Sequence, residues 1–226
     1  MGKTQNTISA PMLNNDVDLI ISNLSIQQSI PTLVYKIPFR DLSHAEKSLM
    51  ESYKYVVTRR GKEFNKTSDL EERIARGAEW MYSHPEKWLF LHGLVGTGKT
   101  SFLNAVILLM NSVKFTARNT DIISVKRVLA RDIDSMENND IEELKKTPIL
   151  AIDDLGAERW QTLQYGNIRE TSTEIIESRY DRRKLTLFAT NHPFKTMEDK
   201  YGLRIYDRLR EMVFIVTFTN DSYRHE

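Results

Sequence analysis

The chain has 226 residues, 40% of them hydrophobic and 28% charged, which is the balance of one globular domain with room for an extension. Its 32 Lys and Arg residues against 31 Asp and Glu exclude a broad basic surface, so any nucleic-acid contact must be local. The absence of cysteine excludes disulfides, Cys-ligated zinc and thiol catalysis, and it favours a reducing compartment. No signal-like start and no run near about 18 apolar residues is present, so we expect a cytoplasmic protein without a membrane partner.

The N-terminal part of the chain is predicted to form an extension. Residues 1 to 30 are polar and hold no aromatic residue, which predicts a mobile arm with one short partner-binding helix. From Leu42 to Val57 the apolar residues keep helical spacing. Because Ser43 and Glu46 match a capping box at its start, we predict an amphipathic helix there.

A basic segment and a second helix come next. Residues 54–66 contain five Lys and Arg residues and a single acid, and we interpret them as a solvated linker, with a nucleic-acid patch as the alternative. Ser68 and Glu71 form a second capping box in front of apolar residues at helical spacing. This second helix is predicted to stop at Pro85.

Beyond Pro85 the pattern changes to short apolar runs separated by intervals long enough for crossover helices. Such a pattern predicts an α/β domain, a three-layer sandwich with a five-stranded, mostly parallel sheet. We therefore divide the chain into an N-terminal extension, residues 1–66, and a main domain, residues 67–226. The predicted strands are Trp88–His92, Val113–Ala117, Ile149–Ile152, Leu185–Ala189 and Val213–Phe218.

A glycine-rich turn lies between the first predicted strand and a helix that begins near Lys99. Its pattern, G-x-x-x-x-G-K-[ST], is that of a phosphate-binding P-loop, in which backbone N–H groups and the N-terminus of the helix surround a phosphate. Lys99 is expected to reach the β- and γ-phosphates of ATP, and the Thr100 hydroxyl to bind Mg²⁺. The predicted nucleotide-binding residues here are Gly93, Val95, Gly96, Thr97, Gly98, Lys99, Thr100 and Ser101.

Two carboxylates follow the third predicted strand. Asp153 and Asp154 come directly after four apolar residues, at the end of a strand where open α/β sheets bind their ligands. Taken alone, such a pair is as often a cap or a turn. With a P-loop upstream, Asp153 becomes a candidate for holding Mg²⁺ and Asp154 for polarising an attacking water.

Polar residues with a less specific signal complete the candidate site. Asn191 follows the fourth predicted strand and is placed to hold a water or the γ-phosphate, although asparagine at a strand end is more often a turn residue. Arg204 and Arg208 lie one helical turn apart, either as an arginine finger for a neighbouring subunit or as surface arginines paired with Asp207 or Glu211.

Several short motifs together resemble the AAA+ family, in particular its branch of bacterial helicase-loader ATPases similar to DnaC and DnaI, with the transposition ATPase IstB as a relative. The resemblance covers roughly residues 86 to 226. The motifs that carry it are Gly-Leu-Val-Gly-Thr-Gly-Lys-Thr (93–100), Ile-Asp-Asp-Leu-Gly (152–156), Ser-Arg-Tyr (178–180), Ala-Thr-Asn (189–191), Tyr-Asp-Arg-Leu (206–209) and Asp-Ser-Tyr-Arg (221–224).

The resemblance implies roles that the residues alone do not. Asn191 becomes sensor 1, Arg208 the arginine finger with Arg204 in the same box, and Arg224 the sensor 2 arginine that contacts the nucleotide in its own subunit. It also implies slow, switch-like ATP hydrolysis, an ATP-dependent helical oligomer and single-stranded DNA in its channel. Only eight residues follow Phe218, so we expect no C-terminal helical lid.

Three functions are compatible with these motifs. The leading hypothesis is a helicase loader of DNA replication, in which residues 1–66 grip a hexameric replicative helicase. The alternative is an IstB-like ATPase that binds duplex target DNA and recruits a transposase, and a third, weaker hypothesis is a small-molecule kinase. Candidate DNA contacts are Lys126, Arg127 and Arg131, which we place in a helical stretch after the second predicted strand.

Overall fold

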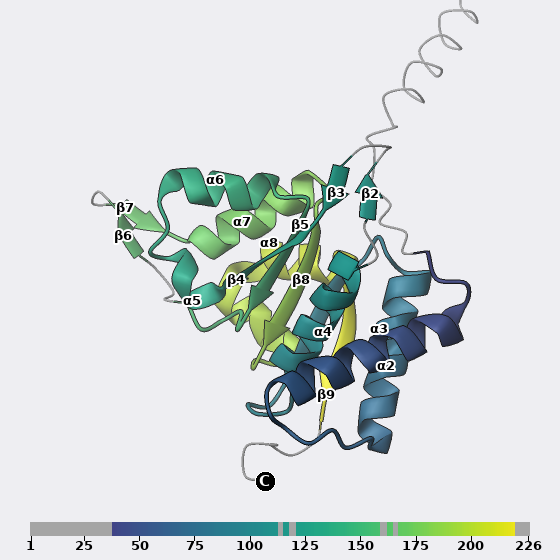
Figure 1. Ribbon diagram of the computed structural model, residues 1–226. Helices are drawn as coiled ribbons and strands as arrows, with labels where there is room; N and C mark the ends of the chain where they lie inside the picture. Colours follow the sequence, from purple (N-terminus) through teal and green to yellow (C-terminus); the bar gives the residue numbers. More distant parts are fainter. Residues whose placement is uncertain (1–37, 113–114, 118–120, 159–161, 165–166, 220–226) are drawn as a thin grey trace, which may run out of the picture. The chain divides into compact units, whose positions relative to one another are not determined.

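The computed structural model describes residues 38–112, 115–117, 121–158, 162–164 and 167–219 (Figure 1). All of them belong to one compact unit. The arm predicted for residues 1 to 30, and Arg224, lie outside the described residues. Within the described part of the chain, no helix is long and apolar enough to cross a membrane.

A parallel five-stranded sheet forms the centre of the described unit. Its strands lie in the order β4-β5-β8-β1-β9, and every neighbouring pair is parallel. All positions of β5 and β8 are buried, because a parallel sheet covered on both faces is built from continuous apolar runs. The α/β fold with a five-stranded parallel sheet is thereby confirmed. The strand bounds are β4 Val125–Leu129, β5 Ile149–Asp153, β8 Leu185–Thr190, β1 Trp88–Gly93 and β9 Val213–Phe218.

One of the five predicted strands is present but does not belong to the main sheet. The run predicted as Val113–Ala117 contains β2, Phe115–Ala117, which pairs antiparallel with β3, Asp121–Ile123, in a separate two-stranded sheet. The place in the main sheet is taken by β4. Because Lys126 and Arg127 lie in β4, they are not helical as predicted, and only Arg131 lies in a helix. The apolar pattern did not predict β4, because the charged residues Lys126 and Arg127 interrupt it.

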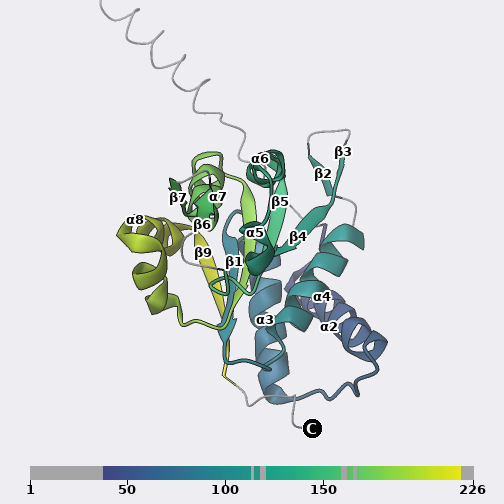
Figure 2. The ribbon, with the colours of Figure 1, turned by 90° about the vertical axis from the view of Figure 1, so that its left-hand side faces the viewer.

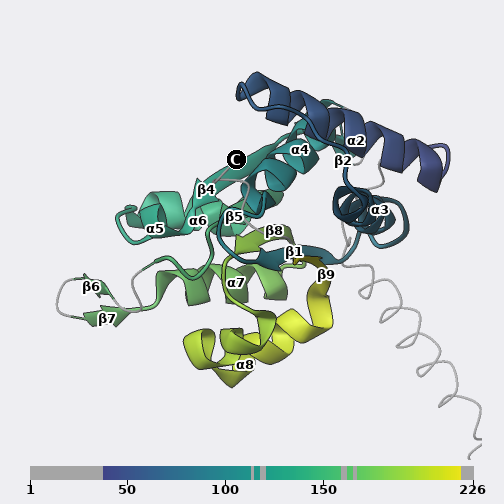
Figure 3. The same cartoon turned by 90° about the horizontal axis from the view of Figure 1, so that it is seen from below.

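Helices cover the two faces of the sheet. Figure 3 shows α2, α3 and α4 on one side of the strands and α7 and α8 on the other. A short antiparallel pair, β6 Thr162–Gln164 and β7 Asn167–Arg169, precedes α7 and extends outward beyond it (Figure 3). Figure 2 shows α8 on the opposite side of the sheet from α4. The helices are α2 Leu42–Arg59, α3 Ser68–Ser83, α4 Lys99–Ser112, α5 Ala130–Ile133, α6 Asn138–Lys146, α7 Thr171–Asp181 and α8 Met197–Met212, with a 3-10 turn η1 at Phe194–Thr196.

The two predicted N-terminal helices are present as α2 and α3, but both begin with a different cap. The side chain of Asp41 accepts from the backbone N–H of His44, and Thr67 accepts from that of Leu70. In each case the cap lies before the serine that we predicted, because the residue just outside a helix satisfies its first free N–H groups.

Helix α2 packs directly on α4, the helix that follows the P-loop. The Ser52 hydroxyl donates to the carbonyl of Ala105 at 2.7 Å, and the ring of Tyr53 lies 6.2 Å from that of Phe102. A Cβ added at Gly77 of α3 would come within 2.6 Å of the Phe102 ring, so α3 approaches as closely as only glycine allows. These contacts fix α4, and with it the P-loop, against the N-terminal helices.

Candidate nucleotide-binding site

The P-loop connects β1 to α4 at the carboxyl edge of the sheet. Gly96 and Gly98 have φ angles of 86° and 94°, in the left-handed region that favours glycine. Between them Thr97 is buried and donates from its hydroxyl to the carbonyl of Leu94 at 2.8 Å, which closes the loop. Val95 lies exposed on the outside of the turn. The backbone therefore curls as a phosphate-binding loop requires.

Lys99 is the first residue of α4 and its ammonium group lies inside the loop. It is 5% exposed and donates to the carbonyls of Gly93 and Leu94 at 2.8 and 2.6 Å. Its charge also acts on the end of β1: burial, and then the positive charge of Lys99, lower the pKa of His92. A cation held at a helix N-terminus and surrounded by loop backbone is placed to meet an anionic phosphate.

Ser101, the last residue of the predicted nucleotide-binding set, contacts a basic residue from outside the motif. The guanidinium of Arg60 donates to its hydroxyl at 2.8 Å. Arg60 follows α2 in the basic segment that we interpreted as a linker, and the fold brings it beside the first turn of α4. No local pattern distinguished Arg60 from its basic neighbours, because the contact spans 41 residues.

Asp153 ends β5 and is almost completely buried. Its Oδ1 accepts from the Thr100 hydroxyl at 3.2 Å and from the backbone N–H of Asp154 at 3.1 Å. The two predicted Mg²⁺ ligands are thus adjacent, although β8 separates β5 from β1 in the sheet. A buried carboxylate beside a hydroxyl is a donor set that fits Mg²⁺, which takes few protein ligands and completes its shell with phosphate and water.

Arg127 of the neighbouring strand β4 contacts the other oxygen of Asp153. Its Nη2 lies 2.5 Å from Oδ2. The Arg127 side chain is 35% exposed, whereas that of Asp153 is 1% exposed. Arg127, predicted as a DNA contact, therefore lies in the candidate nucleotide site. The other two candidate DNA contacts form ion pairs, Lys126 with Glu143 at 2.7 Å and Arg131 with Asp132 at 3.7 Å.

Asp154 and Asn191 meet at the same edge. The Asn191 amide lies 3.5 Å from Oδ1 of Asp154, because the carboxyl ends of β5 and β8 are neighbours. The strand ends are held together by backbone: Leu155 donates its N–H to the carbonyl of Ala189 at 2.8 Å. Asp154 has a φ angle of 55°, so the chain turns sharply where its side chain is presented.

A buried polar cluster, formed by Glu158, Lys200 and Tyr201, connects the loop after β5 to α8. Glu158 accepts from the Gly156 backbone N–H at 2.8 Å and from the Tyr201 hydroxyl, while Lys200 donates to the Gly156 carbonyl. Burial, and then the Glu158 carboxylate, raise the pKa of Tyr201 above its usual range. None of these residues was singled out from the sequence, because each belongs to an unremarkable segment and meets the others only in the fold.

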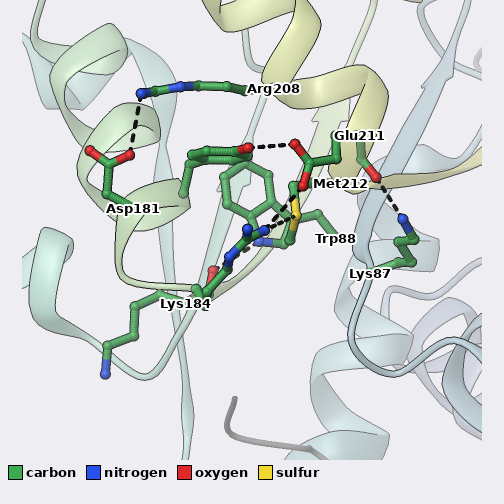
Figure 4. Close-up of polar contacts among 9 residues, drawn as sticks. Lys87, Trp88, Asp181, Lys184, Arg208, Glu211 and Met212 are labelled. Atoms are coloured by element: carbon green, nitrogen blue, oxygen red, sulfur yellow. Dashed lines mark hydrogen bonds and ion pairs between the residues drawn. The ribbon is translucent and has the colours of Figure 1, made fainter. Parts of the chain in front are cut away.

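Arg204 and Arg208 lie on α8, on the other face of the sheet from α4 (Figure 3). Both contact Glu177 of α7, at 3.1 and 3.4 Å, and Arg208 also lies 3.2 Å from Asp181, the contact drawn in Figure 4. The Arg208 guanidinium stacks 4.7 Å from the Tyr180 ring. The pairing alternatives weighed from the sequence, Asp207 and Glu211, are not the ones that these two arginines use among the described residues.

These observations define the fold. Strand β8 lies between the P-loop strand β1 and the acidic strand β5, and Asn191 follows β8 at the same edge. This strand order is that of the AAA+ form of the P-loop fold. Neither a protein-family model nor a curated protein sequence matches the chain.

Solved structures identify the relatives of this fold. It is similar to a crystal structure of the DnaC helicase loader, with 20% identity, a TM-score of 0.54 and coverage of 69% of this chain and 93% of the other. DnaI gives 21% identity, a TM-score of 0.52 and coverage of 76% and 93%. AMPPCP-bound DnaA from Aquifex aeolicus gives 18% identity, a TM-score of 0.53 and coverage of 74% and 51%. The chain has a DnaC/DnaI-like AAA+ fold.

Proposed function

We propose that this chain is an ATP-dependent helicase loader of DNA replication. In this proposal it binds ATP with Mg²⁺, hydrolyses it slowly, assembles with further copies on single-stranded DNA in the cytoplasm and engages a hexameric replicative helicase. The observation that carries the proposal is the meeting of the P-loop, Asp153 and the pair of Asp154 and Asn191 at one sheet edge. The fold shared with DnaC and DnaI supports the loader function.

The P-loop residues would bind the triphosphate. Backbone N–H groups from Gly96 to Thr100 would surround the β-phosphate, and the positive φ angles of Gly96 and Gly98 support this because they curl the loop. Lys99 would exchange its contacts with loop carbonyls for phosphate oxygens, a stronger, charge-assisted interaction. Arg60, held beside Ser101, adds a further positive charge at the start of α4.

Thr100 and Asp153 would hold the Mg²⁺ ion that neutralises charge developing on the phosphates during transfer. The described residues hold no group of three or more His, Asp or Glu side chains arranged for a metal. A site of one hydroxyl and one carboxylate is typical of Mg²⁺ that arrives with a nucleotide.

Asp154 would accept the proton of the attacking water, and Asn191 would orient that water. Asp154 is only partly buried, so water reaches its carboxylate, and the amide of Asn191 lies within 3.5 Å. In an oligomer, Arg208 of one subunit would stabilise the γ-phosphate of the next. Arg224 is proposed as the cis arginine, and it lies outside the described residues.

Residues 1–66 are proposed as the extension that binds the helicase, in front of an ATPase domain of residues 67–226. The described part of this extension includes α2, which packs on α4 through Ser52 and Tyr53. Binding of a partner at α2 would thus act directly on the helix that follows the P-loop.

Affinity capture from the native host tests the loader function. The wild-type chain with ATP and Mg²⁺ is expected to retain the replicative helicase, and Lys99→Ala to retain less of it. Purified helicase should then bind the purified chain. Absence of the helicase with and without ATP contradicts the proposal, and retention of a transposase together with duplex DNA binding would identify the IstB-like alternative instead.

A further inference from the structure

Arg127 places a guanidinium on the carboxylate that is expected to hold Mg²⁺. It projects from β4, whose register sets Arg127 beside Ala151 and Leu129 beside Asp153. The arginine therefore reaches two residues along the neighbouring strand to meet the end of β5. Its contact of 2.5 Å with Oδ2 joins a charge that is 35% exposed to one that is buried.

The remaining oxygen of Asp153 is occupied by the Thr100 hydroxyl and the Asp154 backbone N–H. Both oxygens of the carboxylate thus accept hydrogen bonds, as a buried charge requires. Of these hydrogen-bond donors from the described part of the chain, Arg127 is the one that carries a full positive charge. A Mg²⁺ ion beside Thr100 and Asp153 would bring a second cation to the same carboxylate, and the two positive charges would repel each other at this short range.

We propose that Arg127 is a resident counter-ion of Asp153 that Mg²⁺ displaces when it enters with the nucleotide, so that Arg127 sets how much Mg²⁺ nucleotide binding requires. This inference rests on the proposed ATP binding. The guanidinium is partly solvent-exposed, so it can leave the carboxylate toward water without crossing the core. Arg127 acts as a positioning residue: its ion pair holds the buried carboxylate in place while Mg²⁺ is away.

The experiment measures the Mg²⁺ concentration that gives half-maximal binding of ATP carrying a fluorescent ribose label. Arg127→Gln removes the competing cation, so the midpoint should fall about fivefold, the ratio that corresponds to a partly exposed ion pair. Lys126→Gln is the matched control, because Lys126 precedes it on β4 and pairs with Glu143 instead. Its midpoint should equal that of the wild type.

A double-mutant cycle isolates the pair. In an Asp153→Asn background, Arg127→Gln should no longer shift the midpoint, because the carboxylate for which the two cations compete is gone. Arg127→Lys keeps a cation but loses the planar fork, so its midpoint should lie between those of the wild type and Arg127→Gln. If Arg127→Gln does not fold, the midpoint of Arg127→Lys still tests whether Arg127 and Mg²⁺ compete.

The outcomes separate this inference from the proposed function. If the wild type binds labelled ATP but Arg127→Gln and Arg127→Lys leave the midpoint unchanged, the competition does not exist. If Arg127→Gln weakens binding equally with Mg²⁺ and with EDTA, Arg127 contacts the nucleotide and the inference is overturned. If the wild type binds no ATP at any Mg²⁺ concentration, the proposed function falls, and the inference falls with it.

Discussion

The carboxyl edge of the sheet and the pair of helices α7 and α8 carry the two groups of proposed ATPase residues, and they differ in how complete they are. At the edge, residues from separate elements contact each other within one chain: Thr100 lies against Asp153, and Asn191 lies near Asp154. On α7 and α8, Arg204 and Arg208 contact acids of their own chain. In the proposed function, the edge would exchange the contacts of Lys99 and Arg127 for those of the nucleotide and Mg²⁺ within one subunit, whereas Arg208 would exchange its ion pairs for a neighbour's phosphate.

The same helix pair also contains an arginine that differs from Arg208. Arg179 is completely buried and donates to Thr186 Oγ1 and to the carbonyls of Leu144 and Thr147, at 2.7 to 2.8 Å. It joins the end of α6 to α7 and β8. Arg208 is 14% exposed, and its Nη1 makes no hydrogen bond within the described residues although Glu177 lies 3.4 Å away. Because its donors are satisfied in the core, we interpret Arg179 as a structural residue. Arg208 has a donor without a hydrogen bond, so it would lose less by moving to a new partner.

Lys99→Ala tests the edge with the largest expected effect. Removal of the only ammonium inside the loop should weaken ATP binding by about 100-fold or more, because a charge-assisted contact with phosphate is lost. Calorimetric titration with ATP and Mg²⁺ measures this. Lys87→Ala, at the opposite end of β1, is the control and should bind as the wild type does. Unchanged affinity in Lys99→Ala would contradict the site assignment.

Asp154→Asn should separate binding from hydrolysis at the same edge. The amide cannot accept the proton of water, so turnover should fall by about 100-fold or more while ATP affinity changes little. Phosphate release and nucleotide titration measure the two effects. Asp132→Asn, an exposed aspartate on α5, serves as the control. Loss of ATP binding in Asp154→Asn would show that its role has been misassigned.

Arg179→Met tests the structural side of the comparison. The variant leaves several buried acceptors without their donor, so the free energy of unfolding should fall by about 2–4 kcal/mol. ATP affinity of the folded protein should stay unchanged. Urea unfolding measures the loss, and the exposed neighbour Arg182→Met is the control. A loss below about 0.5 kcal/mol, the range of ordinary surface substitutions, would exclude the structural role.

Arg208→Ala should reduce turnover about tenfold or more in the assembled protein while leaving the ATP affinity of the isolated subunit nearly unchanged. The charge is needed only when the neighbour's γ-phosphate is attacked. Arg204→Ala, one helical turn away and 72% exposed, is the matched comparison and should have the smaller effect. A collapse of subunit ATP affinity in Arg208→Ala would mean that the arginine acts in cis.

Local patterns predicted the P-loop motif, the strands β1, β5, β8 and β9, and the helices α2 and α3. They failed for β4, where Lys126 and Arg127 interrupt the apolar run, since an edge strand tolerates charge that a central strand does not. They also missed each helix cap by one or two residues. Local sequence patterns indicate which secondary structure a segment tends to form, but not which other segment it packs against.

By itself, the sequence determined where the P-loop motif and the acids of the candidate site lie, because each motif is a local pattern of a few residues. Only the tertiary structure decided which charges meet them. Arg127 reaches Asp153 across 26 residues, and Arg60 reaches Ser101 across 41. Such contacts depend on strand order and on the packing of α2 against α4, and these are set by burial of apolar surface over the whole domain rather than by any local motif.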